Sequence, residues 1–248
     1  MLFRLPPEVL TMLIPVLLFA LVFHEFSHGW VANRLGDPTA KYAGRLTLNP
    51  LAHLDMFGSL MILFVGFGWA KPVPVDSRYL ASPRTDMMKI AFAGPASNLL
   101  LAFIGGTLIR IIGNAGSLTS MLYIFTQINI SLAVFNMIPI SPLDGSQIFS
   151  GFMVKRNPQL VMKMQMYGPQ ILMGLILFGM FTSFSPIWLV MSPFVNFFYV
   201  FIHWSLVKRF FSEIIPSRRS KKSLIGTVVL LVVILFLIDY LTNIAKGT

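Results

Sequence analysis

The sequence predicts an all-α polytopic membrane protein with about six transmembrane helices and one short re-entrant or interfacial segment. The 248 residues are 56% hydrophobic and only 11% charged, and their mean hydropathy is +0.76. A soluble domain carries far more charge and less apolar surface. The formal net charge of +10 comes from 19 Lys and Arg against 9 Asp and Glu. Most of these basic residues lie in short loops between apolar runs, so nucleic acid is not an expected partner.

The lengths of the apolar runs define the predicted spans. A helix rises about 1.5 Å per residue and needs about 20 residues to cross the hydrocarbon core. Runs that meet this requirement, or come close to it, lie at 9–31, 87–112, 119–143, 168–184, 186–204 and 223–242. Only Ser185 and Pro186 separate the fourth run from the fifth. A tight hairpin that does not fully cross is therefore the alternative for this pair.

Residues 57–69 are apolar but too few and too rich in glycine to span, so we expect them to be re-entrant or interfacial. If the chain returns to the side from which it entered, the three groups of basic residues at 34–89, 155–163 and 208–222 share one face. The positive-inside rule makes this face cytoplasmic. The prediction is a multi-pass protein of a prokaryotic cell membrane, with both ends outside.

The first apolar run contains the ionisable sequence HEFSH at residues 24–28. His24 and His28 are four residues apart, so on a helix they lie on one face and can bind one ion, with Glu25 beside them. In the HExxH pattern two imidazoles bind zinc and the glutamate is the general base. Ionisable groups in hydrocarbon are costly, which favours a functional site over a polar cluster that only joins helices. The run is therefore expected to be retained and not cleaved as a signal peptide.

Asp144 is the candidate third zinc ligand. The chain has no cysteine, so a metal must be bound by histidine and carboxylate groups. Asp144 follows an inward-running span at about the depth of His24, in the sequence FNMIPISPLDGSQ. Pro139 and Pro142 break that helix, which suits a hydrated segment carrying a metal ligand. Taken alone, SPLDG also fits an ordinary turn.

Together, HEFSH and the pattern Asn136-x-x-Pro139-x-x-x-x-Asp144-Gly145 resemble the site-2 protease family, the intramembrane zinc metalloproteases of peptidase family M50. The segments NPLAHLDMFGS, GWAKPVPVD and AGPASNLL resemble linking segments of its compact bacterial and archaeal branch. The resemblance covers roughly residues 20–153 and includes neither a PDZ-like insertion nor a CBS tail.

This resemblance implies an intramembrane zinc endopeptidase that cleaves in or near a transmembrane segment of a membrane-protein substrate, as in regulated intramembrane proteolysis. It implies His24, His28 and Asp144 as ligands of one Zn²⁺ per chain, Glu25 as the catalytic base and an active site toward the cytoplasm. Two amides are candidate substrate or oxyanion contacts. Asn98 either makes such a contact or forms an interhelical hydrogen bond. Asn136 either orients substrate or supports Asp144.

The predicted metalloprotease domain covers residues 1–205, with its core at 9–153, and residues 206–248 form a basic cytoplasmic linker and a last transmembrane helix. The expected partners are the lipid bilayer and a transmembrane protein or peptide, and a homo-oligomer is left open. The alternative is a non-proteolytic membrane scaffold or metal-binding transporter. A transporter commonly has repeated broken helices, whereas no second half of this chain mirrors the first.

Overall fold

A computed structural model describes residues 6–65, 68–182 and 184–214. Within these ranges every regular element is helical, apart from one isolated antiparallel bridge between Leu54 and Ala70. The predicted all-α class is therefore confirmed. The elements in chain order are α1 (Pro7–Arg34), α2 (Thr39–Tyr42), α3 (Pro50–His53), α4 (Met56–Val65), η2 (Ser77–Tyr79), α5 (Pro83–Ile112), α6 (Ser117–Asn136), α7 (Asp144–Met153), α8 (Pro158–Phe181) and α9 (Pro186–Ile214).

Four of the described helices, α1, α5, α6 and α8, are long and apolar enough to cross a membrane. The apolar part of α9 with described side chains, Pro186–Ile202, is shorter. These five helices occupy the positions of the first five predicted runs. The sixth predicted run, at 223–242, lies outside the described residues, as does most of the predicted 206–248 region.

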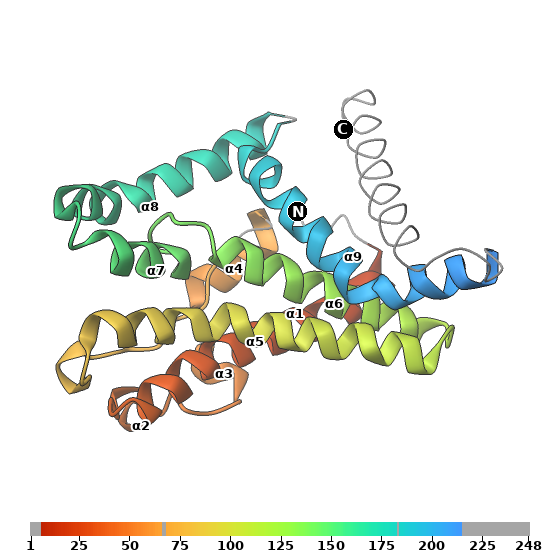
Figure 1. Cartoon of the computed structure of the whole chain (residues 1–248), viewed down its shortest axis with the longest axis horizontal. Helices are drawn as coiled ribbons and strands as arrows, with labels where there is room; N and C mark the ends of the chain where they lie inside the picture. The colour runs from red at the N-terminus through yellow and green to blue at the C-terminus, as the bar shows by residue number, and fades with distance from the viewer. Residues whose placement is uncertain (1–5, 66–67, 183, 215–248) are drawn as a thin grey trace, which may run out of the picture.

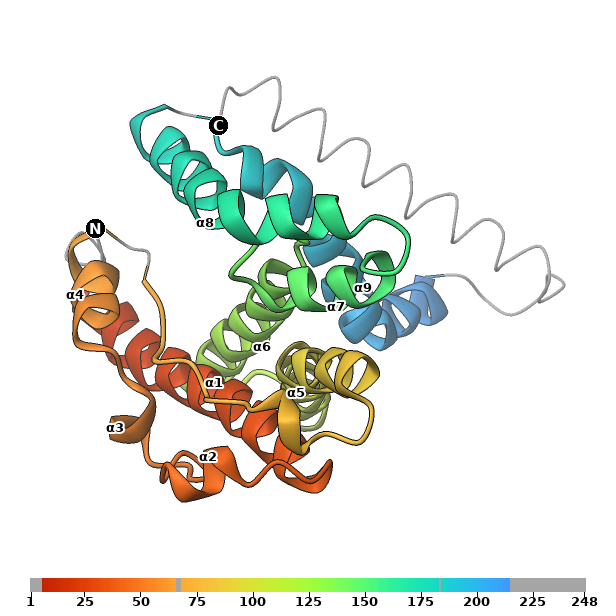
Figure 2. The ribbon, with the colours of Figure 1, turned by 90° about the vertical axis from the view of Figure 1, so that its left-hand side faces the viewer.

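Helix α5 is the centre of the fold, because it packs against α1, α6, α7 and α9 (Figures 1 and 2). Small residues allow this close approach. A Cβ at Gly105 would lie 2.6 Å from Thr126 Oγ1 of α6, and one at Gly106 would overlap Ile202 of α9. Buried apolar residues of α5, α6 and α9 complete this core: Ala102, Ile130, Val134, Met191, Val195 and Ile202.

Helix α6 ends at Asn136, well before the end of the predicted run at 143. The chain then turns, because Pro139 cannot donate a backbone hydrogen bond to continue the helix. Helix α7 begins at Asp144 and folds back onto this turn. A Cβ at Gly145 would overlap the carbonyl of Met137, so only glycine permits the contact. The broken helix expected from the prolines is present, and it delivers Asp144 to the interior.

Helix α4 has ten residues and is too short to cross a membrane. The segment after α4 comes back to the segment before it. The amide of Lys71 donates to the carbonyl of His53 at 2.8 Å, next to the bridge between Leu54 and Ala70. This course agrees with the predicted re-entrant or interfacial segment. The buried His53 ring places Nε2 2.8 Å from the carbonyl of Thr47, which ties it to the adjoining loop.

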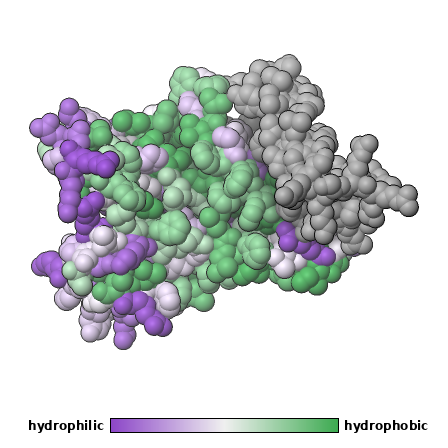
Figure 3. Space-filling view, in the orientation of Figure 1, coloured by the Kyte–Doolittle hydropathy of each residue, from purple (hydrophilic) through white to green (hydrophobic). Residues whose placement is uncertain are grey.

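Hydrophilic residues gather mainly at one end of the molecule, where α1 ends, α5 begins and α7 turns into α8 (Figure 3). Buried Asp37 organises the loops there. Its carboxylate accepts hydrogen bonds from the amide of Thr39 at 2.9 Å and the amide of Asp76 at 2.8 Å. The remaining visible surface is largely apolar, as a surface in contact with lipid is.

Candidate metal centre

Helix α1 places His24 and His28 on one face, as their spacing predicts. Both residues are buried, with 5% and 8% of their surface exposed. The ring centroids are 4.7 Å apart and the ring planes are nearly perpendicular, at 82°. The two imidazoles can therefore direct one nitrogen each toward a common point without stacking on each other.

Asp144, the first residue of α7, supplies the third group. Its Oδ2 lies 3.1 Å from Nε2 of His24, and its Oδ1 lies 3.4 Å from Nε2 of His28. The three side chains each offer one ligand atom, all within 4.8 Å of one another. Helix α7 is held along α5 by a hydrogen bond from Arg84 Nε to the carbonyl of Gly151. The structure thus brings together the three residues that the sequence predicts as ligands.

The other nitrogen of each imidazole faces an acceptor on α5. His24 Nδ1 is 2.6 Å from Oδ1 of Asn98, and His28 Nδ1 is 2.7 Å from the carbonyl of Ile90. A carbonyl oxygen can only accept, so each Nδ1 must carry the proton and donate it. Nε2 is then the nitrogen of each ring that faces Asp144. An imidazole oriented in this way through Nδ1 is the arrangement that metal-binding histidines use.

The donor set fits zinc. Two imidazole nitrogens and one carboxylate form a ligand set that zinc enzymes use for catalytic sites, with a fourth position left for water or substrate. Ligands about 2.0–2.1 Å from a tetrahedral ion lie about 3.3–3.4 Å from one another. The two carboxylate oxygens of Asp144 lie close to this distance from the Nε2 atoms, Oδ2 at 3.1 Å from His24 and Oδ1 at 3.4 Å from His28, and one ligand atom from each residue lies within 4.8 Å of the others. His24, His28 and Asp144 are therefore the residues that would hold the ion.

Asn98 is completely buried between α1, α5 and α6. Its Nδ2 donates to the carbonyl of Ala20 at 3.2 Å and to Oδ1 of Asn129 at 2.8 Å, which fixes Oδ1 toward His24. Of the two roles that the sequence left open, these contacts correspond to the interhelical hydrogen bond. The role of Asn98 toward substrate stays a prediction.

Asn136 makes a different contact from Asn98. Its Nδ2 donates to the carbonyl of Leu132 at 3.0 Å, within its own helix, and the side chain is half-buried. No described contact joins it to the three candidate ligands, so its role toward substrate or Asp144 stays a prediction.

Two residues that support the candidate site were not predicted from the sequence. Asn129 supports Asn98, and its only signal was a face of α6 shared with Asn136 at a spacing of seven residues. Ile90 acts through its backbone carbonyl, and a side-chain pattern cannot reveal a backbone acceptor.

Glu25 follows His24 on α1 and is half-buried. Among the described residues its carboxylate has no hydrogen-bond or ion-pair partner. The position beside the candidate ligands is the one that the HExxH pattern predicts for the base.

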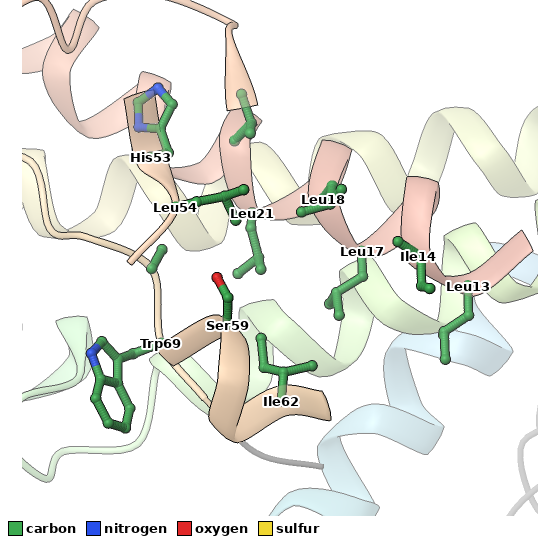
Figure 4. A pocket seen from close by; sticks show the side chains of 12 residues that line it. Leu13, Ile14, Leu17, Leu18, Leu21, His53, Leu54, Ser59, Ile62 and Trp69 are labelled. Carbon is green, nitrogen blue, oxygen red and sulfur yellow. The ribbon is translucent and has the colours of Figure 1, made fainter. Parts of the chain in front are cut away.

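An apolar cavity of about 180 Å³ lies between α1 and α4, lined by side chains other than the three candidate ligands. Figure 4 shows Leu17 and Leu21 of α1 across from Ser59 and Ile62 of α4. Two lining residues, Leu21 and Val22, precede Glu25 by four and three positions. Residues at these spacings share a helix face, so the cavity lies on the side of α1 that carries Glu25.

Comparison with known proteins gives one family. The model of the family described as "Peptidase family M50" matches residues 12–114 and 110–179 of this chain. Three curated relatives bear the name "Putative zinc metalloprotease": YwhC of Bacillus subtilis, MJ0611 of Methanocaldococcus jannaschii and Rip2 of Mycolicibacterium smegmatis.

YwhC is 42% identical over 152 residues, which are 58% of this chain and 69% of the relative. MJ0611 is 34% identical over 143 residues, 55% of this chain and 65% of the relative. Rip2 is 30% identical over 136 residues, 52% of each chain. The chain thus spans less than two thirds of the last two relatives. No solved structure matches the chain significantly.

Proposed function

This chain belongs to peptidase family M50 and is a zinc metalloendopeptidase, and on that premise we propose that it hydrolyses a peptide bond in or next to a transmembrane segment of a membrane-protein substrate. The observation that carries the proposal is the position of the candidate site. His24, Glu25 and His28 lie in a helix long and apolar enough to cross a membrane, and Asp144 meets the two histidines there. A polypeptide that reaches this site must itself enter the membrane.

We assign His24, His28 and Asp144 as the zinc ligands and Glu25 as the catalytic base. When bound, zinc supplies Lewis-acid chemistry: it polarises the scissile carbonyl and makes water easier to deprotonate. Glu25 takes the proton of the attacking water and delivers it to the leaving amine as the C–N bond breaks. Each cycle consumes one water and yields one carboxylic acid and one amine. The position of Glu25 next to His24 on α1 supports this assignment.

Groups around the site hold the candidate ligands in position and give water a route to them. Asn98 and the carbonyl of Ile90 hold the two imidazoles through Nδ1, so the Nε2 atoms remain directed toward Asp144. The turn between α6 and α7 leaves several backbone groups outside helices, and such groups need water or protein partners within a membrane. We infer that this turn, near the polar end of the molecule, admits the water that hydrolysis needs.

The apolar cavity beside α4 supports a transmembrane substrate. It lies on the face of α1 that carries Glu25, and its lining is almost wholly apolar. We assign it to an apolar side chain of the substrate close to the scissile bond. A helical substrate must unwind there, because helical amides and carbonyls are engaged in their own hydrogen bonds.

We place the protein in a prokaryotic cell membrane with the polar end in the cytoplasm. Basic residues in the segments at that end, among them Arg34, Lys41, Arg45, Lys71 and Arg84, support this orientation. Regulated intramembrane proteolysis is the process that such an enzyme serves, and a scaffold or transporter is the competing class.

The deciding experiment compares the membrane proteomes of cells producing the parent protein or the Glu25→Gln variant. We expect uncut membrane precursors to accumulate with the variant, and their missing cut sites to map in or next to transmembrane segments. If no membrane protein differs between the two cell lines although both hold equal amounts of zinc-loaded protein, a binding function takes the place of proteolysis.

A further inference from the structure

Helices α1 and α5 meet in an antiparallel register centred on the candidate metal site. His24 faces Asn98, and His28 faces Ile90. The two contact points on α5 are eight residues apart, and Gly94 lies midway between them, four residues from each. Residues at this spacing form one stripe along a helix. Gly94 is therefore the residue of α5 that lies between the two imidazoles.

A side chain at Gly94 would enter the space used by the metal-binding edges of both rings. A Cβ built there would lie 2.5 Å from Nε2 of His24 and 2.6 Å from its Cε1, and it would also overlap Nε2 of His28. Contacts below about 3 Å between such atoms are not tolerated, so something must move. The rings cannot withdraw freely, because each is held through its Nδ1 by α5 itself.

We propose that Gly94 is a positioning residue of the metal centre: only a hydrogen atom at this position lets both Nε2 atoms stay converged on Asp144 and leaves room for the ion. A methyl group displaces one or both imidazoles and removes the zinc site without removing a ligand. This proposal depends on the proposed function in one respect, that the protein binds zinc, and it holds whether or not the protein cleaves a substrate.

The competing explanation is that glycine at this position serves helix packing alone, as it does elsewhere in α5. Gly105 provides the matched comparison, because a Cβ there would lie 2.6 Å from Thr126 Oγ1 and 2.9 Å from a ring carbon of Phe125, far from any candidate ligand. Gly174 of α8 provides the neutral control, because it is exposed and a Cβ there meets nothing within 4 Å.

The first experiment measures zinc content and zinc affinity of the purified full-length chain in detergent. We expect Gly94→Ala to bind zinc at least 10-fold more weakly than the parent, as disruption of groups that orient ligands does. Gly105→Ala should lose thermal stability but keep parental zinc affinity, and Gly174→Ala should keep both. Parental zinc affinity in Gly94→Ala would overturn the proposal.

The second experiment uses metal-free protein and tests whether the methyl group introduced by Gly94→Ala collides with the imidazole rings. In the metal-free parent, Gly94→Ala should lower the Tm because the methyl group collides with the rings. In a His24→Ala/His28→Ala background the same substitution should leave the Tm unchanged or raise it, because the rings are gone and alanine favours a helix over glycine.

An equal loss of Tm in both backgrounds would show a packing role and overturn the proposal. If Gly94→Ala alone does not fold, folding of the triple variant supports the proposal and failure of the triple variant contradicts it. Neither experiment measures proteolysis, so its failure is distinguishable from failure of the proposed activity.

Discussion

The Nδ1 atom of His24 lies 2.6 Å from Oδ1 of Asn98, a contact between α1 and α5 in which Nδ1 donates and the amide oxygen accepts. Asn98 cannot rotate its amide to escape this contact, because its Nδ2 already donates to Ala20 and Asn129. The orientation of a candidate zinc ligand is thus set by a buried amide on a neighbouring helix. Residues of this kind influence both metal affinity and stability.

Replacing Asn98 by alanine should weaken zinc binding by about 10- to 100-fold, the usual cost of losing a partner that orients a ligand. It should also lower the free energy of unfolding by about 1–3 kcal/mol, because the amide of Asn129 and the carbonyl of Ala20 lose a buried partner. Competition with a fluorescent zinc chelator measures the first effect and thermal unfolding in detergent measures the second. Asn114→Ala is the control and should retain parental zinc affinity, because Asn114 is exposed in the connection between α5 and α6.

Replacing Glu25 by glutamine should abolish cleavage while leaving zinc bound. The substitution preserves the size of the side chain and the three candidate ligands but removes the group that accepts a proton from water. The rate should fall by at least about 10²- to 10⁴-fold. A time course of cleavage of a reconstituted transmembrane substrate, run beside a zinc determination, measures both. Cleavage at the parental rate by a zinc-loaded variant would contradict the assigned mechanism.

Replacing Asp144 by alanine should remove zinc and cleavage together, because it deletes one of three candidate ligands. The zinc-dependent part of the thermal stability should disappear as well, since metal bound to the folded state stabilises it. Elemental analysis and melting curves with and without a chelator provide the measurement. A variant that kept one tightly bound zinc would show that the ion is held by other residues.

Chelator treatment of the parent should reversibly remove activity, and Zn²⁺ should restore it. Magnesium or calcium should not, because a site of two imidazoles and one carboxylate suits zinc better than these hard cations. Activity that persists after complete metal removal would exclude metal-dependent hydrolysis.

The polar end of the molecule should face the cytoplasm. A topology reporter inserted after Arg156, between α7 and α8, should therefore report the inside. A reporter inserted after Asn114, in the connection between α5 and α6, should report the outside. The same side for both would mean that α6 does not cross the membrane.

Filling the apolar cavity should impair cleavage without affecting zinc. Ser59→Phe places a ring into the space between α4 and Leu21, and a misplaced substrate backbone costs about 100-fold in rate. Leu100→Phe is the control, because Leu100 is 56% exposed on the outer surface of α5. An unchanged cleavage rate for Ser59→Phe would show that the substrate does not use the cavity.

Rules that apply to short stretches of sequence are sufficient to predict much of the fold of this protein. Composition and run length predict a helical membrane protein because a bilayer accepts only segments that satisfy their own backbone. The positions of the helices follow from the apolar runs, and the early end of α6 follows from Pro139. The pairing of His24 with His28 depends only on the helical repeat, which is why the sequence predicts it.

Only the tertiary structure decided which distant groups complete the site. Asp144 lies 120 residues from His24 in the chain, and its arrival depends on the packing of α7 along α5. Asn98 could have faced a substrate or a neighbouring helix, and the packing of α1, α5 and α6 turned its amide toward His24. The importance of Gly94 has no chemical signature in the sequence, because its contribution is the absence of an atom. Whether that absence matters depends on what lies opposite, and the antiparallel register of α1 and α5 places two imidazole edges there.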